Sequence, residues 1–118
     1  MAFALTYDEC RARFRRAAEA AGARFEAHAI EARGPEGQTL SLDVARVGRD
    51  PAARVLVVLS GTHGVEGFAG SAIQEALVRD FAAARPLPDD SALVLVHAVN
   101  PYGVAWWRPL LGVSGGLP

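Results

Sequence analysis

A histidine and a glutamate stand three residues apart in the stretch SGTHGVEG, directly after an apolar run. His63 offers an imidazole nitrogen and Glu66 a carboxylate oxygen, and such ligands with one position left open are typical of catalytic zinc sites. The glycines at positions 61, 64 and 67 leave the backbone free to curl, so the two side chains can converge on one ion. The pair could supply two ligands of a metal site, which needs a third.

The same loop also has a purely structural interpretation. Thr62 could cap a helix that follows the loop, and the carboxylate of Glu66 would be favourable near the positive N-terminus of that helix. Taken alone, the spacing favours a helix-capping turn over a metal site.

Other reactive side chains are predicted to have structural roles. His97 shares a strand face with apolar residues, which indicates a core histidine with a hydrogen-bond partner, whereas His28 alternates with charged residues and is expected to be exposed. Ser60 lacks the Gly-x-Ser-x-Gly frame of a nucleophile elbow. Cys10, the sole cysteine, is predicted to be a half-buried helix residue, and Glu75 to lie on an exposed helix face.

The first half of the chain predicts a helix followed by a hairpin. Thr6 and Glu9 have the spacing of a capping box, and Gly22 suits a helix end, so we expect a helix over about residues 7–21. Two alternating segments, residues 23–32 and 39–48, flank the turn RGPEGQ and predict an antiparallel hairpin.

The second half predicts a strand, a helix and a second strand. RVLVVLSG is a continuous apolar run typical of a central strand that is buried on both faces. A helical pattern over about 67–81 and a buried strand starting at residue 91 follow, which favours a right-handed parallel crossover. The predicted fold class is α/β, a mixed sheet with flanking helices in which the hairpin is added to the parallel part. SGTHGVEG and NPYG would then lie at the carboxyl ends of strands, where α/β sheets bind ligands.

Length and composition exclude several classes of protein. The 118 residues fit one domain at most, and 51% of them are hydrophobic. A net charge of -1 argues against a nucleic-acid footprint, and no apolar run is long enough to cross a membrane. All twelve basic residues are arginine, which excludes lysine-dependent chemistry. The N-terminus lacks the pattern of a secretory signal, so we expect a cytoplasmic protein, and the richness in alanine and arginine suggests a bacterial source.

Two longer motifs carry a family resemblance. SGTHGVEGFAGSAIQ followed by HAVNPYGVAWWR resembles the zinc carboxypeptidase superfamily, and in particular a branch of uncharacterised bacterial metallopeptidase-like proteins. The resemblance covers residues 54–108. It implies a zinc-dependent amide hydrolase that acts on a peptide or an acyl amino acid.

The resemblance also assigns roles to individual residues. His63 and Glu66 match the two zinc ligands of the His-x-x-Glu pair, and Arg108 matches an arginine that polarises the scissile carbonyl. The turn from Asn100 to Gly103 matches the Asn-Pro-x-Gly turn that shapes the loop beside the site. Zinc would polarise the carbonyl and lower the pKa of its bound water.

Three parts of the family's active site have no counterpart in this sequence. No histidine follows His97 to serve as the third zinc ligand, and no glutamate follows Glu75 to serve as the general base. Asn100 is the only asparagine, so the Asn-Arg clamp for a substrate carboxylate is also missing.

The expected domain organisation follows from these departures. Residues 1–118 are predicted to form a single, incomplete domain, with family-like residues 54–108 and a divergent tail 109–118. We expect an N-terminal fragment that is inactive alone, with an uncovered sheet edge that favours self-association. The alternatives are a non-catalytic α/β binding or structural module, or a deacylase completed by another subunit.

Overall fold

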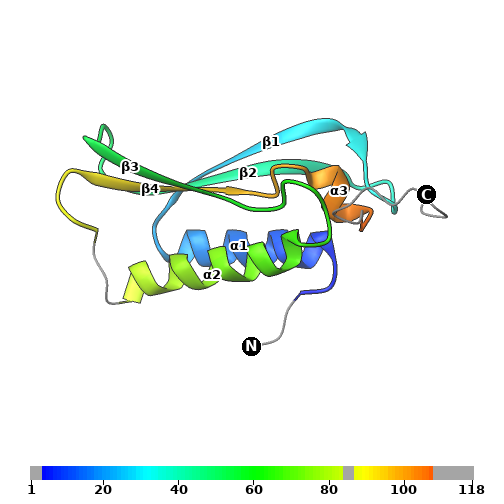
Figure 1. Cartoon of the computed structure of the whole chain (residues 1–118), viewed down its shortest axis with the longest axis horizontal. Helices are drawn as coiled ribbons and strands as arrows, with labels where there is room; N and C mark the ends of the chain where they lie inside the picture. Colours follow the sequence, from blue (N-terminus) through cyan, green and yellow to red (C-terminus); the bar gives the residue numbers. More distant parts are fainter. Residues whose placement is uncertain (1–3, 84–86, 108–118) are drawn as a thin grey trace.

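The residues that the structure describes form a four-stranded mixed sheet with two long helices on one face. The computed structural model describes residues 4–83 and 87–107, and within them no helix is long and apolar enough to cross a membrane. The strand order is β1-β2-β4-β3, and α1 and α2 lie side by side beneath the sheet (Figure 1). The elements are α1 (Tyr7–Ala20), β1 (Arg24–Arg33), β2 (Thr39–Gly48), β3 (Arg54–Leu59), α2 (Gly67–Ala83), β4 (Ser91–His97) and α3 (Pro101–Ala105).

The predicted first helix and hairpin are confirmed. The backbone N–H of Glu9 donates to Thr6 Oγ1 over 3.1 Å, so Thr6 caps α1 as the sequence indicates. The strands β1 and β2 pair antiparallel, with Phe25 opposite Ala45. Their turn closes with a hydrogen bond from Gly37 N to Gly34 O.

The strand-helix-strand unit is confirmed as well. The strands β3 and β4 pair parallel, from Arg54 opposite Ser91 to Leu59 opposite Val96, and α2 connects them. Parallel strands that are neighbours in a sheet end at the same edge. The loops that follow β3 and β4 therefore meet at one end of the molecule.

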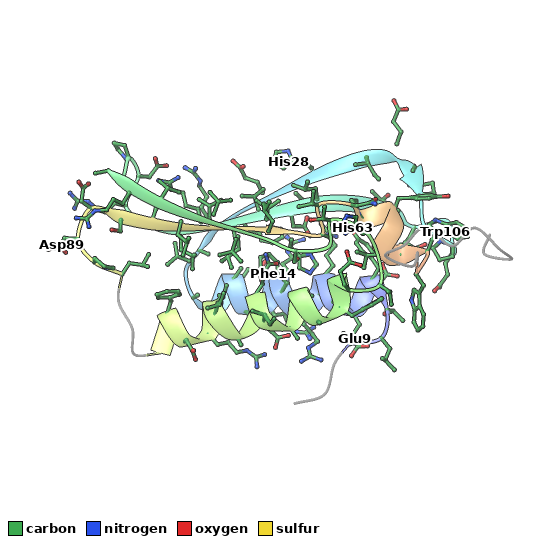
Figure 2. The ribbon with its side chains drawn as sticks, in the orientation of Figure 1. Glu9, Phe14, His28, His63, Asp89 and Trp106 are labelled. Carbon is green, nitrogen blue, oxygen red and sulfur yellow. The ribbon has the colours of Figure 1, made fainter. Side chains whose placement is uncertain are left out.

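The core lies between the two helices and the sheet. Phe14 of α1 is fully buried there (Figure 2), and it packs with Val78 of α2, Ala45 of β2 and Leu95 of β4. These residues follow the helical and strand periods of the sequence, so burial of apolar area holds the helices against one sheet face.

The prediction that β3 is a central strand is wrong. β3 is an edge strand, and four of its side chains are among the most exposed large apolar groups: Val55 at 47%, Leu56 at 62%, Val57 at 52% and Leu59 at 59%. Val58 packs on the core, so by strand alternation Val55, Val57 and Leu59 face away from α1 and α2. A continuous apolar run predicts a strand whose two faces are both apolar. It does not show whether the described residues pack on both of those faces.

We predict that this edge promotes self-association, because an apolar edge strand offers unpaired N–H and C=O groups to another chain. Val57→Lys should lower the apparent mass in sedimentation at high protein concentration. It should change the free energy of unfolding by only about 0.5 kcal/mol, as is usual for an exposed position. The matched control is Ala27→Lys on β1, the opposite edge of the sheet. If both variants lower the apparent mass equally, or if neither variant lowers it, a role for β3 in self-association would be contradicted.

Glu75 also differs from its prediction. It is only 5% exposed, and its carboxylate pairs with Arg13 of α1 at 2.9 Å and with Arg79 at 2.8 Å. The sequence predicted an exposed helix face, which is wrong, because α1 packs against that side of α2. Periodicity within one helix cannot reveal a second helix beside it.

Candidate metal centre

The loops after β3 and β4 are joined by backbone hydrogen bonds beyond the strands themselves. Ser60 N donates to Val96 O over 3.1 Å, Val99 N donates to Ser60 O over 2.8 Å, and Asn100 N donates to Gly61 O over 2.7 Å. Gly61 has a φ of +68°, a conformation that glycine adopts without steric cost. The loop that carries His63 and Glu66 therefore begins from a fixed position.

Asn100 ties this loop to α3. Its Nδ2 donates to the carbonyl oxygen of His63 over 3.0 Å, and its Oδ1 accepts from Gly103 N over 3.0 Å, which caps α3. A Cβ on Gly103 would collide with the same carbonyl oxygen of His63. The Asn-Pro-x-Gly turn thus shapes the loop as the family resemblance implied, with Asn100 as the contact that does so.

The carboxylate of Glu66 binds the backbone of its own loop. It accepts from His63 N over 2.8 Å and from Gly64 N over 3.0 Å. Burial acts to raise the pKa of Glu66, but the hydrogen bonds from these N–H groups and the nearby His63 outweigh it, so the pKa lies below its ordinary value. Glu66 is therefore held as a carboxylate, the form that binds metals.

His63 and Glu66 are close enough to share one ion. His63 Nδ1 lies 3.3 Å from Glu66 Oε1, and the side chains are 59% and 37% exposed. Two ligands at zinc distances of about 2.0–2.1 Å, separated by a tetrahedral angle, would lie about 3.4 Å apart. The chemistry of the pair and its spacing thus fit two ligands of a zinc ion. The same spacing also allows a direct hydrogen bond between the two groups.

Residues 4–83 and 87–107 provide no third ligand near this pair. Across the part of the chain that the structure describes, no group of three or more His, Cys, Asp or Glu side chains could hold a metal ion. His28 is 60% exposed on β1 (Figure 2), as predicted. Arg108, the predicted catalytic arginine, and the tail 109–118 lie outside the described residues.

His97 is a core histidine, as the sequence predicted. It is 1% exposed, its Nε2 lies 2.8 Å from Ser71 Oγ, and its ring stacks on Phe14 with centroids 4.6 Å apart. Burial lowers the pKa of His97 to about 4, with a further contribution from the charge of Arg11. His97 is therefore a neutral imidazole near pH 7, with its Nε2 engaged by Ser71.

Ser60 has a structural role that the sequence did not reveal. Its hydroxyl donates to Gln74 Oε1 over 2.9 Å, and Gln74 Nε2 donates to the carbonyl oxygens of Val58 and Val96. Gln74 is 1% exposed and thus connects α2 to both parallel strands. A single glutamine within a helical pattern carries no signal for this contact.

Comparison with known proteins identifies the family. The family model described as "Protein of unknown function (DUF2817)" matches residues 3–111. The chain belongs to the DUF2817 family. No curated protein matches this DUF2817 chain significantly.

Solved structures of glutaminyl cyclases share the fold of this DUF2817 chain. The enzymes from Tannerella forsythia, Fimbriiglobus ruber and Porphyromonas gingivalis match with TM-scores of 0.54, 0.52 and 0.50 at 13%, 14% and 16% identity. Each match covers 75% of this chain but only 37%, 36% and 36% of the respective cyclase. The chain therefore spans little more than a third of the length of these enzymes. The α/β fold is confirmed, and membership of the zinc carboxypeptidase superfamily stays a prediction.

Proposed function

We propose that the chain is the N-terminal part of a zinc-dependent enzyme that cleaves or transfers an amide-bonded acyl group. The observation that carries this proposal is the 3.3 Å separation of His63 Nδ1 and Glu66 Oε1 at the carboxyl ends of two parallel strands. Ligand sites of α/β sheets lie at such ends. The resemblance of both flanking motifs to zinc carboxypeptidases supports the choice of zinc.

The residues of this chain would hold and orient the metal. His63 would supply a nitrogen ligand and Glu66 an oxygen ligand, while Asn100 holds the backbone of His63. When bound, zinc would polarise the amide carbonyl and activate a water molecule. Arg108 is proposed to polarise the same carbonyl, and the third ligand and the general base are proposed to come from polypeptide outside the described residues.

The proposed substrate is a peptide or an acyl amino acid. Structural neighbours are by name glutaminyl cyclases, which supports a substrate with a peptide-like amide.

Zinc titration of the purified chain tests the metal site. We expect one zinc ion per chain, with affinity reduced at least about tenfold by His63→Ala or by Glu66→Gln, since even outer-shell changes cost that much. Gln keeps the shape of Glu66 and an oxygen for the backbone N–H groups. His28→Ala removes another exposed imidazole and is the control.

A non-catalytic module is the second candidate, because two ligands within the described residues make an incomplete site. Under it, His63→Ala would change neither zinc content nor the zinc-dependent rise in melting temperature. If zinc instead supports the fold, His63→Ala would lose both the bound zinc and the zinc-dependent rise in melting temperature, since a ligand that binds only the native state stabilises it.

A further inference from the structure

An apolar pocket lies beside the candidate metal centre. It has a volume of about 310 Å³, close to the lower limit for ligand pockets. Among the residues that the structure describes, its lining contains no charged side chain and consists of Ala4, Leu5, Val65, Phe68, Ala69 and Trp107.

The pocket and the candidate ligands share one loop. Val65, which lines the pocket, is the residue directly before Glu66 and two after His63. Phe68 and Ala69 belong to the first turn of α2. Figure 2 shows Trp106, the chain neighbour of Trp107, at the same end of the molecule as His63. A molecule with its polar group at the ligand pair could therefore place an adjoining group in the pocket.

The inner wall of the pocket is held by the core. Phe68 packs against the buried cluster that includes Tyr7, Leu40 and Val104. Its ring meets Trp107 edge-on, with centroids 5.5 Å apart and planes at 65°, a favourable aromatic geometry. Leu5, Val65 and Trp107 nevertheless remain 65%, 42% and 52% exposed. The pocket thus has a fixed floor and apolar walls accessible from outside.

Size and polarity define the group that fits. A dry apolar cavity of about 150 Å³ is enough to bind benzene, and this pocket has about twice that volume. An aromatic ring with one or two methylene groups, or a branched aliphatic chain, would fill it. A charged group would lose hydration without gaining a charged partner from the described lining residues.

We propose that this pocket binds an aromatic or branched aliphatic group attached to the amide of the substrate. The inference deepens the proposed function and rests on it for the position of the amide beside His63 and Glu66. It makes Val65 and Leu5 specificity-determining residues, because each contributes an exposed apolar wall.

The test compares two probes that differ only in the apolar group, N-phenylacetylglycine and N-acetylglycine. Binding is measured by calorimetry on the whole chain without zinc, so the result does not depend on the metal. We expect the phenyl compound to bind at least tenfold more tightly. Val65→Asp and Leu5→Asp should abolish this difference. Ile73→Asp, at a 60% exposed position of α2 outside the pocket, should preserve it.

Each outcome bears on one proposal only. Equal affinity for the two probes overturns the pocket, and this includes the case in which other residues of the chain occupy it. The pocket is also overturned if Ile73→Asp loses the difference in affinity as fully as Val65→Asp and Leu5→Asp do. Leu5→Asp keeps the test informative if Val65→Asp disturbs the loop. If the chain discriminates between the two probes but binds no zinc in the titration, the pocket stands and the metal site is overturned. If the chain binds zinc but does not discriminate between the probes, the metal site stands and the pocket is overturned.

Discussion

Arg11→Met is expected to lower the free energy of unfolding by about 3–5 kcal/mol, the usual cost of leaving a buried charge without its partner. The guanidinium of Arg11 binds both carboxylate oxygens of Asp43, over 2.7 and 3.2 Å. Asp43 is fully buried on β2. Without Arg11 the Asp43 carboxylate would lie in the core with no compensating charge. Urea unfolding at two protein concentrations measures the change and controls for self-association.

The matched control is Arg24→Met. Arg24 pairs with Asp50 at 2.8 Å, nearly the same distance, but the two side chains are 62% and 50% exposed. Exposed pairs contribute about 0.2–1 kcal/mol, so the control should have little effect. Equal losses in both variants would show that burial of Asp43 does not determine the cost. Adding Asp43→Asn to Arg11→Met should recover part of the stability.

Acid is expected to destabilise the protein through His97 by about 3 kcal/mol, since one pKa unit corresponds to about 1.4 kcal/mol. Burial lowers the pKa of His97 from 6.5 to about 4. Between these values the unfolded chain binds a proton that the folded chain does not, so stability falls as the pH falls. The stability that depends on a neutral His97 is fully present above pH 6.5, and it is lost progressively as the pH falls to about 4.

His97→Gln isolates this effect. Glutamine does not titrate and keeps an amide that can bond Ser71, the partner of His97 Nε2. Arg11 and its ion-pair partner Asp43 are charged groups near His97, but both are present in the wild type and in the His97→Gln variant. The difference in unfolding free energy between wild type and variant should therefore shrink or reverse from pH 7 to pH 4. A constant difference over that range would contradict the lowered pKa of His97.

The elements of the fold could be predicted from local patterns. The capping spacing of Thr6 and Glu9 and the alternation of the hairpin each depend on neighbouring residues, and both are confirmed. The place of β3 at an edge and the burial of Glu75 depend on distant segments. Periodicity reports which faces are apolar, and it does not report what packs on them.

The candidate site was predicted in part. Residue types and spacing made His63 and Glu66 candidates, but only the family resemblance favoured a metal site over a helix-capping turn. The structure brings the two side chains within 3.3 Å. The family resemblance implied only that the turn from Asn100 to Gly103 shapes the loop beside the site. The hydrogen bond from Asn100 to the carbonyl oxygen of His63 was not predicted, because the two residues lie on different loops. The apolar pocket was not predicted, since Leu5, Val65 and Trp107 come from three separate segments.

X-ray absorption at the zinc edge tests the central claim most directly. The account predicts that zinc bound to the chain has one imidazole nitrogen at about 2.0–2.1 Å and carboxylate oxygen in its first shell. The imidazole signal should disappear in His63→Ala and persist in His28→Ala. An imidazole signal that survives His63→Ala, or a first shell unchanged in Glu66→Gln, would contradict the assignment of these two residues as zinc ligands.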